Sequence, residues 1–206
     1  MLKTGNNDLD LFLKDIERGI ILVYGGGATG KTTFGLQCSL EHSFDNKKVL
    51  FLDTENSFSL ERIKQMKKDY EKYLENTFVV NLNSFEELDK KLDFFEKVSD
   101  KFNLIVLDTF GVYYRLKLQK EGYVVANEFA IKILRKLKHI SKTIPVILIN
   151  QVYENEKGSI ALGGQMIKNF SNYILEFSKE PRKIKMIKPL EKEFSFEIKA
   201  EGIVEV

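Results

Sequence analysis

Cysteine is nearly absent from this chain, and so are other residue types that mark particular protein classes. The 206 residues include one cysteine, two histidines, three prolines and no tryptophan. The single Cys38 excludes a disulfide framework and a cysteine metal cluster, so we expect a small core residue there. His42 and His139 have no acidic or cysteine partner at metal-ligand spacing, and we expect both at the surface or at helix ends.

Long apolar runs and a strong charge of one sign are missing as well. No stretch of 18 or more apolar residues occurs, which predicts no membrane span. The N-terminus lacks a secretory apolar core, so we expect a cytoplasmic protein. The formal net charge is +2, and contact with nucleic acid would therefore need a local basic patch. With 43% hydrophobic residues, the chain is long enough for one globular domain, which we expect to cover 1–206.

A complete phosphate-binding pattern is present. Residues 25–32 read GGGATGKT and match G-x-x-x-x-G-K-[ST]. An apolar strand pattern over 20–24 precedes it, and a helix pattern over 31–43 follows. The loop's backbone N–H groups and the helix N-terminus suit phosphate oxygens, with Lys31 on the β- and γ-phosphates and Thr32 on Mg²⁺. The predicted nucleotide-binding residues are Gly25, Gly26, Gly27, Ala28, Thr29, Gly30, Lys31, Thr32 and Thr33. The alternative is a glycine turn that caps a buried helix.

Apolar strands and amphipathic helices alternate along most of the chain. Strand patterns occupy 20–24, 48–53, 78–82, 104–108 and 145–150, and helix patterns occupy 31–43, 59–75, 84–97 and 124–142. This order predicts an α/β fold with a mostly parallel sheet that helices cover on both faces. Short segments at 173–177, 183–187, 194–200 and 203–206 predict a C-terminal antiparallel extension of that sheet.

Polar side chains end three of these strands. Asp108 lies 76 residues after Thr32 and is predicted to orient Mg²⁺. Glu55 follows the second strand and is the preferred candidate for orienting the attacking water; Asp53 competes with it, or both cap the next helix. Gln151, after Asn150, is predicted to sense the γ-phosphate, unless the pair forms a helix cap or turn.

Two segments and one basic run could contact nucleic acid. Aromatic and basic residues alternate around 113–122, a composition that suits single-stranded DNA; the candidate contacts are Tyr114, Arg115, Lys117 and Lys120. The segment 153–159 carries two acids and is a poorer candidate. A third candidate is the run Arg182, Lys183, Lys185 and Lys188. The alternatives are ordinary surface loops and a solvated face.

In this order, these pieces resemble the RecA/RadA recombinases, and among them most the short archaeal paralogues of RadA. The similar segments are the P-loop, 52–62, 108–115, 150–152, 162–175 and 194–202. The resemblance implies a RecA-type P-loop NTPase core that binds ATP with Mg²⁺ and is a weak or DNA-dependent ATPase. It implies that Glu55 is catalytic together with Lys31 and Gln151, and that Arg62 packs on adenine. It further implies single-stranded DNA and a RadA-type recombinase as partners in repair, with a homodimer as an option.

The chain departs from the recombinase pattern in four places. We expect no N-terminal helical DNA-binding domain and no upstream segment for filament docking. The second loop is short and lacks the usual basic residues, and the segment at Lys188-Pro189 lacks an expected aspartate. These departures favour an accessory protein over an autonomous recombinase. The alternatives are a nucleotide switch that acts through protein contacts and a self-phosphorylating clock-type ATPase, which the missing second domain disfavours. A small-molecule kinase is disfavoured by the lack of an arginine-rich lid.

Overall fold

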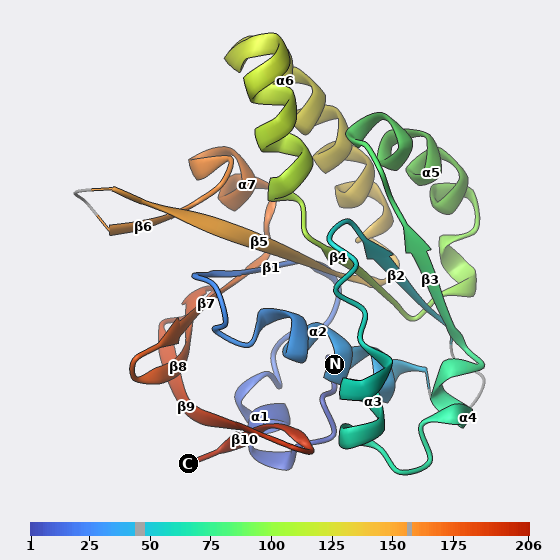
Figure 1. Cartoon of the computed structure of the whole chain (residues 1–206), viewed down its shortest axis with the longest axis vertical. Helices are drawn as coiled ribbons and strands as arrows, with labels where there is room; N and C mark the ends of the chain where they lie inside the picture. The colour runs from blue at the N-terminus through green and yellow to red at the C-terminus, as the bar shows by residue number, and fades with distance from the viewer. Residues whose placement is uncertain (44–47, 156–157) are drawn as a thin grey trace.

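The computed structural model describes residues 1–43, 48–155 and 158–206, with the side chains of all of these except 153–155 and 158–161. Figure 1 shows the arrangement of the elements. The helices are α1 (Asn7–Phe12), α2 (Lys31–His42), α3 (Leu60–Met66), α4 (Glu71–Leu74), α5 (Phe85–Lys97), the short 3₁₀ helix η1 (Ser99–Lys101), α6 (Gly111–Ile140) and α7 (Gly164–Phe170). The strands are β1 (Gly19–Gly25), β2 (Val49–Asp53), β3 (Thr77–Asn81), β4 (Leu104–Asp108), β5 (Pro145–Asn155), β6 (Gly158–Ala161), β7 (Tyr173–Lys179), β8 (Arg182–Lys188), β9 (Lys192–Lys199) and β10 (Gly202–Glu205).

One sheet organises the chain. Its strand order is β10-β9-β8-β7-β1-β5-β4-β2-β3, with β6 paired to β5. The strands from β7 to β3 run parallel, and the pairs β7–β8, β8–β9 and β9–β10 are antiparallel. The predicted fold class, a mostly parallel α/β sheet with a C-terminal antiparallel extension, is therefore confirmed.

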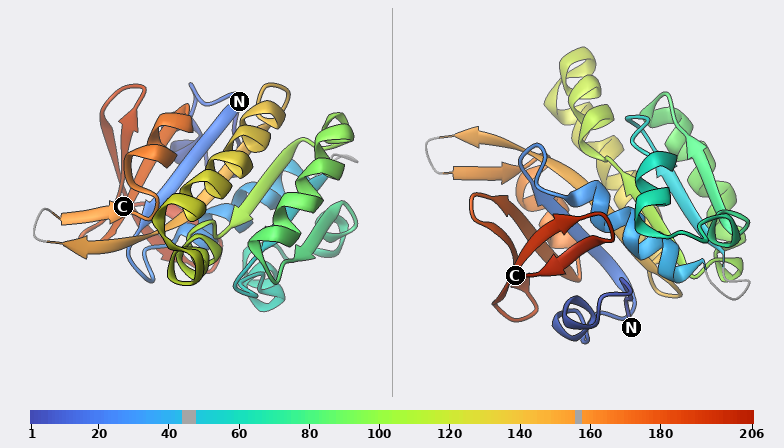
Figure 2. Two further views of the ribbon diagram at one scale, coloured as in Figure 1. Left: turned by 90° about the horizontal axis from the view of Figure 1, so that it is seen from above. Right: turned by 60° about the horizontal axis from the view of Figure 1, so that its bottom comes forward.

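Two helical layers explain why the central strands are apolar throughout. Alternate residues of β1 point to opposite faces, so that Ile20 and Leu22 pack in one core and Ile21 and Val23 in the other. Helices α5, α6 and α7 cover the first face, and α1, α2, α3 and α4 cover the second, as the two views in Figure 2 show. A strand that is buried on both faces has no solvent side for polar residues.

The antiparallel extension curls over the second layer. Phe196 of β9 packs edge-on against Phe177 of β7, with 5.9 Å between ring centroids, and Phe194 lies 5.4 Å from Phe12 of α1. The backbone N–H of Ile203 in β10 donates to the Gln37 side chain of α2 at 2.8 Å. In the right panel of Figure 2 these strands, in red, lie beside the start of α2 and above α1. The extension thereby brings β9 beside the first turn of α2.

Parallel pairing gathers the predicted polar residues at one edge of the sheet. Asp53 pairs with Asp108 across β2 and β4, and Gly25 pairs with Gln151 across β1 and β5. Because all four residues lie at or near the carboxyl ends of parallel strands, they meet at the edge where α/β proteins bind ligands.

The prediction of one continuous helix over 59–75 is wrong. Helix α3 ends at Met66, because Lys67 is extended (φ −138°, ψ 118°), and α4 begins again at Glu71. The ammonium group of Lys67 forms an ion pair with Glu41 of α2, with 2.6 Å between Nζ and Oε1. The helical spacing of apolar residues holds within α3 and restarts at Tyr70, so the pattern alone did not reveal the break.

The expectation of a loop around 113–122, in the first candidate DNA segment, is also wrong, because Gly111–Glu121 is helical. Helix α6 starts at Gly111 rather than near 124 and continues to Ile140. Its helical dihedrals are interrupted at Gly122 (φ 83°, ψ 175°), which separates two helical halves. The first half is anchored by Tyr113, whose hydroxyl donates to the Leu82 carbonyl, and by Tyr114, which donates to Asn127 at 2.8 Å.

The strand predicted to end at Asn150 is longer than expected. β5 continues to Asn155 and forms a hairpin with β6, in which Val152 pairs with Ala161. The second candidate DNA segment, 153–159, falls on this hairpin. Its side chains, and residues 156–157 entirely, lie outside the described residues.

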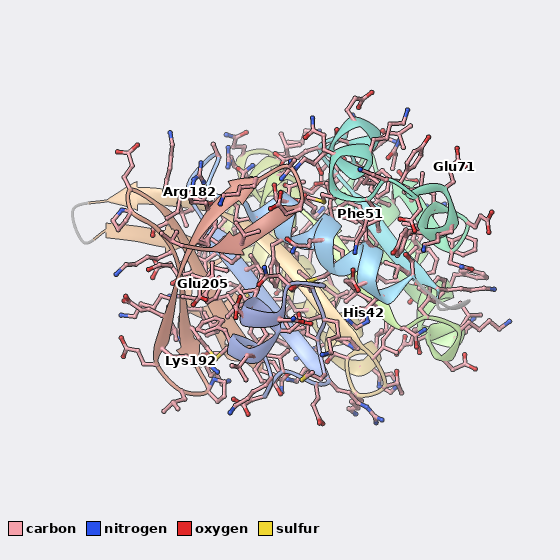
Figure 3. All side chains as sticks on the ribbon, turned by 90° about the horizontal axis from the view of Figure 1, so that it is seen from below. His42, Phe51, Glu71, Arg182, Lys192 and Glu205 are labelled. Carbon is pink, nitrogen blue, oxygen red and sulfur yellow. The ribbon has the colours of Figure 1, made fainter. Side chains whose placement is uncertain are left out.

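The residues singled out by their scarcity lie where the sequence predicted. Cys38 is buried in the second core, and burial raises its thiol pKa well above the ordinary value. His42 is the last residue of α2, labelled in Figure 3, and its Nε2 accepts from the Lys3 backbone N–H at 3.1 Å. His139 lies in the last turn of α6, 3.7 Å from Glu96. Within the described residues, no helix is long and apolar enough to cross a bilayer, and no group of three metal-ligating side chains occurs.

Candidate nucleotide-binding site

The P-loop connects β1 to α2, and two of its glycines are required by the protein itself. A Cβ on Gly25 would lie 2.2 Å from the Phe177 carbonyl oxygen. Gly30 has φ +103°, a conformation that side chains rarely adopt, and its Cβ would lie 2.9 Å from Ile198. These two positions hold the loop between β7, β9 and the start of α2.

Gly26 and Gly27 need a different explanation. A Cβ on Gly26 would meet no described atom closer than 3.9 Å, and one on Gly27 would meet none within 4 Å. The protein therefore leaves space above these two residues. Glycines whose backbone is open in this way let a ligand approach the peptide N–H groups closely, as a phosphate-binding loop requires.

Lys31 is the first residue of α2 and is buried. Its Nζ donates to the Gly26 carbonyl at 2.5 Å and to the Thr29 hydroxyl at 3.3 Å. Burial lowers the pKa of this ammonium group, while Asp108 and Glu55 act in the opposite direction. A cation held against neutral acceptors in a partly dry pocket is suited to bind an anion such as a phosphate oxygen.

Asp108 ends β4 opposite Thr32. The Thr32 hydroxyl donates to Asp108 Oδ2 at 2.7 Å, and the Ser57 hydroxyl donates to the same oxygen at 2.9 Å. Burial raises the pKa of Asp108 to about 6, with smaller contributions from Glu55 and Asp53 against the two hydroxyl groups. Asp108 Oδ1 is buried, and no described residue hydrogen-bonds it.

This donor set fits a hydrated Mg²⁺ ion. A free carboxylate oxygen and a nearby threonine hydroxyl are hard oxygen ligands, which Mg²⁺ prefers alongside water and phosphate. Thr32 and Asp108 are thus the residues that would hold the metal, directly or through its water. A bound cation would also oppose the effect of burial on the Asp108 pKa, because it stabilises the ionised carboxylate.

Asp53 and Glu55 have different environments. Both Asp53 oxygens accept from the loop that follows β2: Oδ1 from Glu55 N (3.1 Å) and Ser57 N (3.0 Å), and Oδ2 from Phe58 N (2.9 Å). Asp53 therefore shapes this loop and does not cap the next helix, because Ser59 is the N-cap of α3 and its side chain accepts from Arg62 N. Glu55 is exposed and lines the pocket beside the P-loop, which favours it over Asp53 as the water-orienting residue.

Thr54 and Ser57 are site residues that the sequence analysis missed. Thr54 Oγ1 donates to the Thr109 carbonyl at 2.9 Å and accepts from the Thr109 N–H at 2.7 Å. Together with the Ser57–Asp108 hydrogen bond, these contacts tie the end of β2 to the end of β4. Only the presence of hydroxyl residues directly after a strand pointed to this role.

The two residues of the predicted sensor pair have separate roles. Asn150 is fully buried, and its Nδ2 donates to the Leu162 carbonyl at 2.7 Å, which anchors the chain after the hairpin. Gln151 faces the pocket, and its Nε2 donates to Glu55 Oε1 at 2.7 Å. Gln151 is therefore the member of the pair that is near the candidate chemistry.

These residues line one pocket of about 370 Å³. Its walls come from the P-loop, from the ends of β2 and β4, and from β5; the lining residues include Gly25, Gly26, Gly27, Ala28, Lys31, Thr32, Glu55, Asp108 and Gln151. A second pocket of about 270 Å³ lies on the other side of the loop, between Thr33 and Ile198. Arg62 does not line either pocket; its guanidinium donates to the Lys199 carbonyl at 2.6 Å and the Ala200 carbonyl at 3.3 Å, at the β9–β10 turn.

The candidate DNA contacts on α6 are only partly available. Tyr114 is buried, and Lys117 is buried with its Nζ 2.6 Å from Glu86 and 2.8 Å from Glu121. In this arrangement neither side chain can stack on a base or meet a phosphate. The expectation of a loop hid this, because on a helix Lys117 faces Glu86 of α5 and Tyr114 faces Asn127 in the second half of α6. Arg115 and Lys120 are exposed.

The C-terminal basic run is largely occupied by contacts within the chain. Lys183 lies 2.9 Å from Glu193, Lys185 pairs with Glu191, and Lys188 donates to the Ser171 carbonyl at 2.6 Å. Arg182, labelled in Figure 3, donates to the carbonyl of Ala28 in the P-loop at 3.2 Å. These contacts favour a solvated, internally neutralised face, the alternative weighed for this run.

Comparison with known proteins agrees with this geometry. The Rad51 family model matches residues 1–206. A DNA repair and recombination protein RadB from Pyrococcus abyssi is 38% identical over 161 residues, covering 74% of this chain and 67% of that protein. The RadB protein of Methanocaldococcus jannaschii is 32% identical over 177 residues, covering 82% and 83%. A crystal structure of the RadB recombinase superposes with a TM-score of 0.80 at 29% identity, over 100% of both chains. The chain therefore belongs to the Rad51 family, within the RecA/RadA superfamily, and resembles its RadB members.

Proposed function

We propose that this protein binds ATP together with Mg²⁺ at the pocket between the P-loop and the ends of β2, β4 and β5. One observation carries the proposal: Lys31, the Thr32–Asp108 pair and Glu55 line the same cavity, beside two glycines whose backbone is open. Lys31 would neutralise the β- and γ-phosphates. Thr32 and Asp108 would hold the metal, which when bound neutralises charge on the phosphates.

We further propose slow hydrolysis of the bound ATP. Glu55 lies at the phosphate end of the pocket, where its carboxylate can accept a hydrogen bond from an attacking water. Gln151 would sense the γ-phosphate, because it lines the same pocket and its Nε2 donates to Glu55. In the second pocket, the Ile198 side chain offers an apolar contact for the base. Arg62 would reach adenine only by leaving the β9–β10 turn.

Titration with a fluorescent ATP analogue tests the first proposal. We expect saturable binding that Mg²⁺ strengthens and that unlabelled ATP competes away. Release of inorganic phosphate from unlabelled ATP then tests hydrolysis separately. No saturable binding with Mg²⁺ present would contradict the nucleotide site.

The relatives supply the biological context of this site. RadB proteins are named for DNA repair and recombination. We propose the same setting here: an ATP-binding accessory protein that acts on single-stranded DNA and assists a RadA-type recombinase. Arg115 and Lys120, on the exposed side of α6, are the retained candidates for phosphate contact.

A second function is favoured by a specific observation. Tyr114 and Lys117 are buried, and the C-terminal basic run is occupied by acids and carbonyl groups. A nucleotide-dependent switch that acts through protein contacts needs none of these residues on DNA. The two functions predict different results for single-stranded DNA.

Fluorescence anisotropy of a labelled single-stranded oligonucleotide separates them. The measurement is made at low and physiological salt, each with and without ATP and Mg²⁺. Salt-sensitive binding supports the recombination role. Absence of binding under all four conditions, in a sample that binds ATP, supports the switch.

A further inference from the structure

Two consecutive hydrogen bonds connect helix α6 to the candidate water-orienting carboxylate. The Arg115 Nη2 atom donates to Gln151 Oε1 at 2.7 Å, and Gln151 Nε2 donates to Glu55 Oε1 at 2.7 Å. The three residues belong to α6, β5 and the loop after β2, so their meeting depends on the tertiary fold. Gln151 and Glu55 line the phosphate pocket, whereas Arg115 does not.

The donors and acceptors of the three groups allow these two hydrogen bonds to run in one direction only, from Arg115 to Glu55. A guanidinium has only donors, and an ionised carboxylate has only acceptors. The Gln151 amide has an oxygen on one side and an NH₂ group on the other. With Arg115 on its oxygen, the amide can only present its NH₂ group to Glu55.

Without Arg115, the Gln151 amide keeps only its hydrogen bond to Glu55 and loses the bond that holds its oxygen. Its side chain could then move together with the Glu55 carboxylate away from the pocket. Glu55 is exposed and Gln151 is only partly buried, so packing alone holds neither side chain firmly. Arg115 thus supplies the second hydrogen bond that holds the Gln151 amide in place beside the carboxylate.

We propose that Arg115 is a positioning residue for hydrolysis: it fixes the amide of Gln151, and Gln151 in turn holds the Glu55 carboxylate toward the attacking water. This inference rests on the proposed ATP hydrolysis. It makes no use of DNA, and its test is therefore carried out without DNA. The role of Arg115 is distinct from contact with substrate, because the guanidinium lies outside the pocket lining.

The test compares Arg115→Ala with Arg115→Lys and with Arg135→Ala. Arg135 is an exposed arginine of the same helix and is the matched control. We expect Arg115→Ala to lower kcat about tenfold, part of the 10²–10⁴ that a positioned base contributes, while KM and nucleotide affinity stay within about twofold. Arg115→Lys, which keeps a donor toward Gln151, should recover much of kcat. Arg135→Ala should match the unmodified protein.

A second comparison tests whether Arg115 acts through Gln151. If Arg115 acts through Gln151, the double variant Arg115→Ala/Gln151→Ala should turn over no more slowly than Gln151→Ala alone. Additive losses would overturn the proposal. So would equal kcat in Arg115→Ala and Arg135→Ala, or a loss of nucleotide affinity that parallels the loss of kcat. No phosphate release by the unmodified protein would instead overturn the proposed hydrolysis, and this inference with it.

Discussion

At the scale of single residues, the candidate site combines charged groups that are costly to bury without a counter-charge. Lys31 is buried against neutral acceptors, and the buried Asp108 has one oxygen without a partner among the described residues. Both groups would gain a counter-charge when a metal–nucleotide complex binds. Such uncompensated charge marks binding sites more often than structural cores.

Replacing Lys31 by alanine should weaken nucleotide binding and leave the fold intact. A charged hydrogen bond is worth about 1.5–3 kcal/mol, so the dissociation constant for Mg²⁺–ATP should rise by at least about tenfold. The unfolding free energy should change by less than about 1 kcal/mol, because the ammonium group has only two hydrogen bonds among the described residues, one of them long. Isothermal titration calorimetry and urea denaturation measure the two quantities. Unchanged affinity would refute the P-loop assignment.

Asp108 should make the ligand-free protein less stable as pH rises. Its pKa is about 6 in the folded chain and 3.8 when unperturbed, so between these values the folded state holds the extra proton. Stability is then highest below about pH 4 for this group and falls as pH approaches 6, by roughly 2–3 kcal/mol. Asp108→Asn should remove this component in urea denaturation at pH 4 and pH 7.

The exposed Asp100→Asn change is the matched control and should keep the pH dependence of the unmodified protein. Addition of Mg²⁺ and ATP should also reduce the dependence, because a cation stabilises the ionised carboxylate. A profile of Asp108→Asn that matches the unmodified protein would contradict this account.

At the scale of elements, α6 links the outer helical layer to the site. Its first half carries Arg115, and its second half packs on α5 through Asp89, which is hydrogen-bonded to Lys132 (2.5 Å) and Lys136 (2.6 Å). Between them lies Gly122, whose backbone no L-residue adopts easily. The geometry of this helix therefore sets where Arg115 meets Gln151.

Gly122→Ala should destabilise the protein through the backbone alone. At φ +83° an alanine is strained, whereas no described atom lies within 4 Å of its Cβ. We expect a loss of about 1–3 kcal/mol in unfolding free energy, or faster hydrogen exchange over 111–121 if the first half shifts instead. Gln119→Ala, at an exposed helical position, is the control. A Gly122→Ala protein with unaltered stability and exchange would show that this conformation is not required.

Asp89→Ala should loosen the contact between α5 and α6. Burial raises the pKa of Asp89, but the hydrogen bonds from Lys132 and Lys136 outweigh it and lower the pKa below its ordinary value. The contribution is thus present above about pH 4 and is lost as pH falls further. We expect a loss of about 1–3 kcal/mol at pH 7 in urea denaturation. Asp93→Ala, whose side chain is 58% exposed, should cost less than about 1 kcal/mol.

At the scale of the whole molecule, charge limits how nucleic acid can be bound. The net charge is +2, and many basic side chains are paired within the chain. A broad attractive field is therefore absent from the described residues. The antiparallel extension, which carries Arg182, Lys192 and Glu205 on the side away from Glu71 in Figure 3, mixes both signs of charge.

If Arg115 and Lys120 make the two proposed phosphate contacts, single-stranded DNA binding should be salt-sensitive, with a slope of log K against log salt near −1.4. Arg115→Ala should flatten the slope by about 0.7, whereas Arg182→Ala should leave it unchanged. Anisotropy titrations from about 50 to 200 mM salt measure it. An unchanged slope in Arg115→Ala would remove this residue from the DNA interface.

Local sequence was sufficient for the fold class and for most residues that line the candidate phosphate pocket. The P-loop pattern, the continuous apolar strands and the acids at the strand ends can all be recognised from residues that are neighbours in the sequence. The structure has the predicted elements in the predicted order. The errors arose where packing between distant segments decides. The segment 116–122 is helical because Tyr113, Tyr114 and Lys117 find partners on the Leu82 carbonyl, Asn127 and Glu86, which no local pattern reveals.

What only the tertiary structure decided is which polar groups meet. Strand order places Asp53 beside Asp108 and Gly25 beside Gln151, although these partners are 55 and 126 positions apart in the sequence. The same order joins Arg115 to Glu55 through Gln151 and reveals Ser57 on Asp108. Residue types and local periodicity set which groups are available, because they act through neighbouring positions. Hydrogen bonds between strands and helices set their partners, because those depend on how remote segments pack.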